Sequence, residues 1–133
     1  MSFFNYLEDN VLDHVTGKLS YTSPTVYIGL SSTTPAEDGT NVTEPSTGSY
    51  ARVTTSAGDW NSASTGATSN LNAITFAQST GDWVSGANLT YLVAYDAITT
   101  GNELFYGLLT VAKPVLSGDT ASFPAGDIDI TLD

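Results

Sequence analysis

The hydrophobic pattern of this chain changes its period once, near Gly17. Before that residue, apolar side chains recur at intervals of three and four, which predicts an amphipathic helix over residues 3–16. They are Phe4, Leu7, Val11, Leu12 and Val15. Ser2 or Asn5 is expected to cap the start of the helix, and Gly17 to end it. The apolar stripe can pack against its own domain or against a neighbouring subunit, and the sequence leaves both open.

After Gly17 the pattern becomes that of short strands separated by segments rich in Ser, Thr, Gly and Pro. We expect strands over residues 25–31, 50–55, 71–76, 89–96, 103–111, 119–123 and 127–132. The turn residues 99–102 predict a hairpin between the fourth and fifth of these strands, and residues 124–126 predict one between the last two.

Side-chain alternation within these strands indicates antiparallel sheets. In the strand 89–96, Val93 and Tyr95 share one face with Tyr91, while Leu92 and Ala94 share the other. In the last strand, Ile128, Ile130 and Leu132 alternate with polar residues, as in a sheet with one solvated face. We therefore expect a single mainly β domain over residues 1–133, an antiparallel β-sandwich or small barrel with one short N-terminal α-helix.

Two features of the loops are candidates for function. Residues 32–49 form one long polar loop, and loops of this length often make functional contacts, here with neighbouring subunits or a receptor. The tripeptide Gly-Asp-Trp occurs twice and places Trp60 and Trp83 in loop-like segments. We interpret both Trp side chains as anchors that hold long loops onto the ends of the sandwich. The alternative is that they stack on a sugar ring.

The composition argues against catalysis. The chain has three Lys and Arg residues, one His and no Cys, set against 14 carboxylates. Most catalytic sites need a base, a nucleophile and an orienting group, and the single His14 lies in the predicted helix. We therefore expect no enzyme activity, no cofactor and no metal site. We expect the acidic C-terminal residues to act as solvated edges that discourage aggregation between sheets.

The net charge of −11 limits the partners, because phosphate backbones and anionic membranes repel such a protein. No apolar stretch approaches the roughly 18 residues that span a membrane. The first residues also lack the basic start and apolar run of a signal peptide. We expect a protein made in a cytoplasm, with no nucleic-acid partner and no membrane insertion. Arg52 lies in a predicted strand, and we favour Glu44 as its structural partner over an intersubunit salt bridge.

Short motifs spread over nearly the whole chain point to a family. They are residues 5–8, 12–14, 26–31, 35–39, 44–45, 48–53, 73–76, 81–83, 106–107 and 123–127. The most specific are Gly-x-Tyr-Ala-Arg-Val at 48–53 and Phe-x-Ala-Gly-Asp at 123–127. With these motifs the chain resembles a family of small structural proteins of tailed bacteriophages, often described as tail-fibre-like.

The resemblance implies a non-enzymatic virion protein, a tail or tail-fibre subunit that acts through oligomeric assembly. The expected partners are further copies of itself, with a trimer as a guess, and other virion proteins. The alternatives are a capsid decoration protein on the outer head surface and a receptor- or glycan-binding module that contacts the host surface. The expected assembly interface comprises Phe4, Leu7, Val11, Val15 and Arg52.

Overall fold

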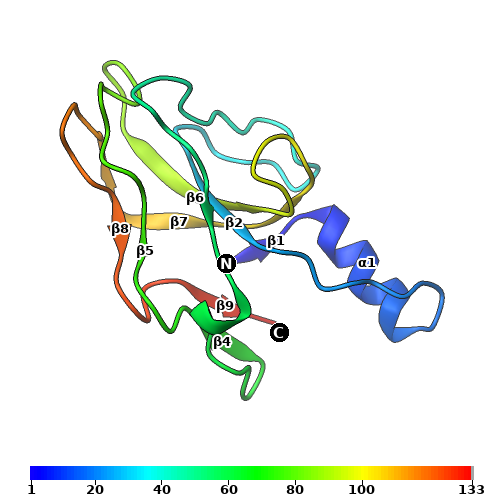
Figure 1. Ribbon diagram of the computed structural model, residues 1–133. Coiled ribbons are helices and arrows are strands. Elements are labelled where there is room, and N and C mark those ends of the chain that lie inside the picture. The colour runs from blue at the N-terminus through cyan, green and yellow to red at the C-terminus, as the bar shows by residue number, and fades with distance from the viewer. Residues whose placement is uncertain (133) are drawn as a thin grey trace.

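The computed structural model describes residues 1–132 and is mainly β, with one α-helix near the N-terminus (Figure 1). The elements are β1 (Ser2–Phe3), α1 (Asn5–Val15), β2 (Tyr27–Ser31), β3 (Val53–Thr54), the 3₁₀ turn η1 (Ala57–Asp59), β4 (Ala67–Ser69), β5 (Ile74–Thr75), β6 (Leu89–Tyr95), β7 (Glu103–Lys113), β8 (Ser122–Phe123) and β9 (Asp129–Thr131). The predicted fold class is confirmed.

The strands form one five-stranded sheet and two small ribbons, all with antiparallel pairing. The sheet has the order β1-β7-β6-β2-β3, and the ribbons pair β4 with β9 and β5 with β8. The predicted hairpin between β6 and β7 is confirmed. Its turn is closed by Asp96, whose Oδ1 accepts a hydrogen bond of 2.7 Å from the backbone N–H of Asn102.

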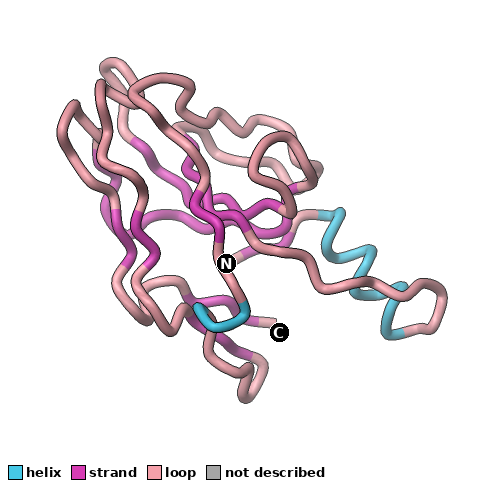
Figure 2. Tube along the Cα trace, in the orientation of Figure 1, coloured by secondary structure: helices cyan, strands magenta, loops and turns pink. Residues whose placement is uncertain are grey.

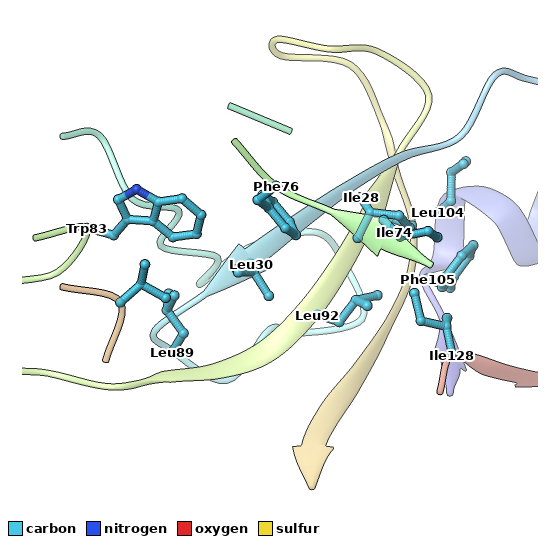
Figure 3. Packing of buried hydrophobic residues seen from close by; sticks show 12 residues of the cluster. Ile28, Leu30, Ile74, Phe76, Trp83, Leu89, Leu92, Leu104, Phe105 and Ile128 are labelled. Carbon is cyan, nitrogen blue, oxygen red and sulfur yellow. The ribbon is translucent and has the colours of Figure 1, made fainter. Parts of the chain in front are cut away.

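The main core lies between the five-stranded sheet and the two ribbons, which gives the molecule a sandwich-like arrangement (Figure 3). Leu92 and Ala94 of β6 face this core, whereas Val93 and Tyr95 face a second cluster on the opposite side of the sheet with Phe4. The alternation predicted for this strand is therefore confirmed. Both faces of β6 are buried, because the second face is covered by Phe4, which precedes α1, and by Val42 of the 32–49 loop.

The predicted C-terminal hairpin is wrong. Ser122–Phe123 pairs with β5, and Asp129–Thr131 pairs with β4, so the two strands separate after Phe123 instead of folding on each other. Asn70 explains the separation. Its fully buried side chain donates to the carbonyl of Pro124 at 2.7 Å and accepts from the N–H of Ile128 at 2.8 Å. These bonds hold the turn against β4. Local turn residues gave no sign of this long-range contact.

Strand lengths also differ from those expected. The strands predicted at 50–55 and 71–76 shorten to Val53–Thr54 and Ile74–Thr75, while β7 extends to Lys113. Phe3, which the periodicity assigned to the helix, lies instead in β1, where Ser2 and Phe3 pair with Tyr106 and Phe105 of β7. β4 was not predicted.

The two ends of α1 are stabilised differently, the first without a side-chain cap and the second by a glycine. Phe4 occupies the N-cap and makes no side-chain capping bond, so the expected caps Ser2 and Asn5 are wrong. The N–H of Asn5 is instead satisfied by the carbonyl of Glu37 at 2.9 Å. At the other end Gly17, with φ +76°, ends the helix as predicted. The N–H of Lys18 bonds the carbonyl of Asp13 at 2.8 Å, the paired closure that a glycine after a helix permits.

Candidate assembly surfaces

Helix α1 and the segment that follows it project from the β domain (Figures 1 and 2). We call residues 5–25 the arm. The return segment runs back beside the helix, and the N–H of Tyr21 donates to Nδ1 of His14 at 3.2 Å. None of the eleven residues of α1 is buried. The arm therefore presents most of its surface away from the domain that bears it.

The residues predicted for docking divide between the root and the tip of the arm. Phe4 is fully buried, with its ring centroid 4.6 Å from that of Tyr106, so it anchors the arm and offers no surface to a partner. Leu7 packs against the core, and Val11 is half-buried. Val15 is 76% exposed. The predicted docking set left out Leu12, which belongs to the apolar stripe and is 62% exposed, and Leu19, which is 54% exposed.

Arg52 makes its ion pair within the chain, with the partner that the sequence favoured. Its Nη2 lies 2.6 Å from Oε2 of Glu44, and its Nε donates to both carboxylate oxygens. Its Nη1 donates to the carbonyls of Ala97 and Thr100, each at 2.7 Å. The side chains are 8% and 21% exposed. The pair therefore joins the 32–49 loop to the β6–β7 turn and leaves little of Arg52 for a neighbouring subunit.

Two tyrosines complete this network. The hydroxyl of Tyr50 donates to Oε1 of Glu44 at 2.7 Å and accepts from the N–H of Leu30 at 2.9 Å. The guanidinium carbon of Arg52 lies 3.2 Å from the ring centroid of Tyr95, a cation–π contact.

The environment shifts the pKa of three members of the network, the two tyrosines and Arg52. Burial, followed by the charge of Glu44, raises the pKa of both Tyr50 and Tyr95 well above the ordinary value. For Arg52 burial acts to lower the pKa, but the hydrogen bonds and charge of Glu44 outweigh it and the pKa is raised. Groups fixed in this way hold loops together and do not exchange protons near neutral pH.

The two Gly-Asp-Trp segments both use their indole N–H groups inside the chain. Trp83 is 3% exposed, packs against Phe76 and Tyr50, and donates to the carbonyl of Gly48 at 3.1 Å (Figure 3). Trp60 is half-buried and donates to the hydroxyl of Thr55 at 3.1 Å. The burial of Trp83 contradicts the sugar-stacking alternative for that residue.

The motif at residues 48–53 owes its residue types to packing. Gly48 has φ +62°, and a Cβ there would overlap the carbonyl oxygen of Gly81. The carbonyl of Gly48 accepts from the N–H of Thr80 as well as from Trp83. Only glycine allows two backbones to approach so closely in this conformation. The motif that is most specific to the family resemblance is therefore a structural junction between two loops.

A groove of about 810 Å³ opens between β7 and the segment 119–129, and sequence reasoning did not predict it. Its floor includes the core residues Leu89 and Leu92. Along one wall Leu108 is 71% exposed and Val111 59% exposed.

The groove wall exists because β7 departs from its partner strand. Leu108 pairs with Tyr91 and Lys113 with Leu89, so the four residues 109–112 lie opposite Thr90 alone. Such a bulge bends its strand away from the ladder. The run Leu-Leu-Thr-Val-Ala at 108–112, which lacks the expected alternation, is the sequence signal that could have indicated it.

Within residues 1–132, no group of three or more His, Cys, Asp or Glu side chains is placed to hold a metal ion. Over the same residues, the structure has no helix with the length and apolar character needed to cross a membrane.

Comparison with known proteins gives one family. The family model described as Podophage GP4 fiber I protein gp80 matches residues 2–131 of the chain. No curated protein matches the chain significantly. The family match covers nearly the whole chain and confirms the resemblance to a phage tail-fibre-like family.

Proposed function

Because the chain belongs to the podophage GP4 fiber I protein gp80 family, we propose that it is a structural subunit of a phage fibre that works by assembling with copies of itself and with other virion proteins. We place it on the phage tail. Such a subunit acts through repeated contacts between folded domains, and it needs no chemistry beyond those contacts. The single-domain organisation that the sequence predicts suits that role.

One observation carries the assembly part of this proposal, the apolar surface of the arm. Leu12, Val15 and Leu19 are each more than half exposed on a unit that projects from the domain. Large apolar side chains gathered on one projecting element are typical of a contact site for another protein. The buried Phe4 fixes the root of the arm and thereby holds this surface in a defined position.

The interior of the domain supports a structural role as well. The Arg52–Glu44 pair, both indole N–H groups and the 48–53 motif all serve to hold loops against the sheets. The indole groups, which the sequence offered as candidates for ligand binding, thus make their hydrogen bonds within the chain. A fibre subunit without disulfides needs such internal ties to keep long polar loops ordered.

The test of assembly is the mass of the purified protein in solution, measured by light scattering over a range of concentrations. The proposal predicts a defined oligomer, and Leu12→Asp is expected to dissociate it while leaving the fold intact, since Leu12 is 62% exposed. Leu71→Asp is the matched control, because Leu71 is 51% exposed and lies outside the arm. A wild-type protein that remains monomeric at high concentration, or an oligomer indifferent to Leu12→Asp, would contradict the proposal.

A further inference from the structure

We propose that the polar pocket between the 32–49 loop and the β6–β7 turn binds a small hydroxylated ligand that carries an ammonium group, such as an amino sugar. The pocket has a volume of about 360 Å³, within the range of small-molecule sites in proteins. In Figure 1 the loop, in cyan, and the turn, in yellow, lie side by side. This ligand site goes beyond the proposed function and does not depend on assembly.

The pocket is built before any ligand arrives. Its lining includes Glu44, Arg52 and Tyr95. The ion pair of Arg52 with Glu44, and the bonds from Arg52 to the carbonyls of Ala97 and Thr100, hold the loop and the turn together. A ligand therefore does not have to order these two segments, which lowers the free-energy cost of binding.

The hydroxyl of Tyr95 has no hydrogen-bond partner within the described chain. Tyr95 is 2% exposed and lines the pocket. Burial raises its pKa, and the charges of Glu44 and Glu103 raise it further, so both carboxylates lie near its ring. Yet no hydrogen bond of acceptable geometry joins this hydroxyl to another group in residues 1–132. Over those residues the one enclosed side-chain oxygen or nitrogen without a partner belongs to Tyr21, so the Tyr95 hydroxyl is accessible from the pocket. Polar groups of buried residues normally have a partner, which here a ligand would supply.

Glu103 brings a negative charge that the described chain does not neutralise. Its side chain is half-buried and accepts no hydrogen bond from residues 1–132. The nearby cation, Arg52, is already paired with Glu44. A Cβ at Gly39 would lie 2.8 Å from Oε2 of Glu103, so the lack of a side chain at Gly39 keeps room beside this carboxylate. An ammonium group offers three donors and the opposite charge, and charge-assisted hydrogen bonds of this kind are the strong ones.

The charges of the pocket select the class of ligand. Two carboxylates, those of Glu44 and Glu103, stand against the one guanidinium of Arg52, so the lining has an excess of negative charge. The chain as a whole carries a net charge of −11. Phosphates and sugar acids are therefore repelled. A neutral sugar gains hydrogen bonds alone, whereas an ammonium compound gains hydrogen bonds and charge attraction together.

Groups that can bind hydroxyls lie beside the carboxylate. The Tyr95 hydroxyl can both donate and accept. The Arg52 guanidinium has five N–H donors, and its bonds to Glu44, Ala97 and Thr100 use the Nε donor, both Nη1 donors and one Nη2 donor, which leaves one on Nη2. A ligand with hydroxyl groups next to its ammonium group can satisfy all of these groups, so an amino sugar fits the pocket better than a simple alkylamine does.

Titration of the purified protein with glucosamine, followed through backbone amide signals in nuclear magnetic resonance spectra, tests the site. The pH is kept slightly below neutral so that the amine is protonated. Binding is expected to saturate with a dissociation constant in the millimolar range, as suits so small a ligand. The largest shifts are expected at Gly39, Gly101 and Glu103, which line the pocket. N-acetylglucosamine has the same ring without the charge and is expected to bind at least about tenfold more weakly.

Two substitutions remove the groups that the chain leaves unpaired. Glu103→Gln removes the charge and is expected to weaken glucosamine binding at least about tenfold, and Tyr95→Phe is expected to weaken it about threefold or more. Neither change breaks a side-chain hydrogen bond within residues 1–132, so urea unfolding is expected to show that both variants fold. Asp129→Asn is the matched control, because it removes an exposed carboxylate outside the pocket.

Three kinds of result would overturn the proposal. Shifts that do not saturate, or that are largest outside the pocket, would show that glucosamine has no site here. Equal affinity for N-acetylglucosamine, or an equal loss in Asp129→Asn and Glu103→Gln, would show that the ammonium group and Glu103 do not meet. Calcium chloride that shifts the same signals, with no shift from glucosamine, would indicate a metal-ion site instead. None of these results bears on the mass of the oligomer, so this inference can fail while the proposed function stands.

Discussion

The Arg52–Glu44 pair offers the sharpest prediction about what holds this domain together. Replacing Arg52 with Met keeps an apolar stem of similar length but removes every donor that Glu44 and the β6–β7 turn receive from the guanidinium. The Glu44 carboxylate is then left with the Tyr50 hydroxyl as its remaining side-chain partner among the described residues. The 32–49 loop loses its tie to the turn at residues 97–100.

The expected loss is large because the pair is shielded from water. Removing one member of a buried ion pair typically costs 3–5 kcal/mol, whereas a surface pair contributes about 0–1 kcal/mol. With side chains 8% and 21% exposed, we expect Arg52→Met to lower the free energy of unfolding by about 3 kcal/mol. That is a substantial part of the roughly 5–15 kcal/mol that stabilises a domain.

Urea unfolding followed by tryptophan fluorescence measures this quantity. All variants are compared in the Leu12→Asp background so that assembly adds nothing to the apparent stability. Glu44→Gln and the double variant complete a cycle in which the double loss is expected to be smaller than the sum of the single losses by about 1–3 kcal/mol. Lys113→Met, which removes an exposed cation, is expected to change stability by less than about 0.5 kcal/mol. A loss below about 1 kcal/mol for Arg52→Met would refute the reasoning, because it would place the pair among surface salt bridges.

Three further predictions concern the loop junctions. Gly48→Ala should destabilise the domain by more than about 2 kcal/mol, because its Cβ would overlap a facing backbone carbonyl. Gly86→Ala, with φ +69° and open space around it, should cost only the left-handed strain of about 1 kcal/mol. Equal urea midpoints for the two variants would contradict this prediction. Trp83→Phe should cost about 1 kcal/mol through the lost hydrogen bond to the part-buried carbonyl of Gly48, and thermal unfolding indistinguishable from wild type would count against it. Because the fold raises the pKa of Tyr50 and Tyr95 above the unfolded value of 10.0, the stability that their neutral forms contribute is complete below that pH and falls as the pH rises above it. An ultraviolet titration should show these phenols ionising only together with unfolding, and early reversible ionisation of all tyrosines would be evidence against their burial.

Local periodicity predicted the elements whose partners are near in sequence. The hairpin of β6 and β7 follows from alternation and a turn signal, and the end of α1 follows from Gly17. The last two strands escaped prediction because Asn70, more than 50 residues away, decides where they go. Long-range side-chain hydrogen bonds of this kind produce no periodic pattern in the sequence, so they cannot be predicted from periodicity.

The candidate surfaces were likewise predicted only in part from the sequence. The helix was recognisable as amphipathic, but its spacing did not reveal that Phe4 is the anchor and Leu12 the exposed residue. Which part of a stripe is buried depends on where the helix leaves the sheet, here at the pairing of β1 with β7. The groove depends on a bulge opposite Thr90, and the apolar run 108–112 becomes informative only once the strand register is known.

Antibody labelling of intact phage particles in the electron microscope tests the central claim most directly. The account predicts label on fibres at the tail, with the same label lost from particles that carry Leu12→Asp because the subunit no longer assembles. Label spread over the head would contradict the tail placement and favour the capsid decoration alternative. Particles without any label would contradict a structural role in the virion.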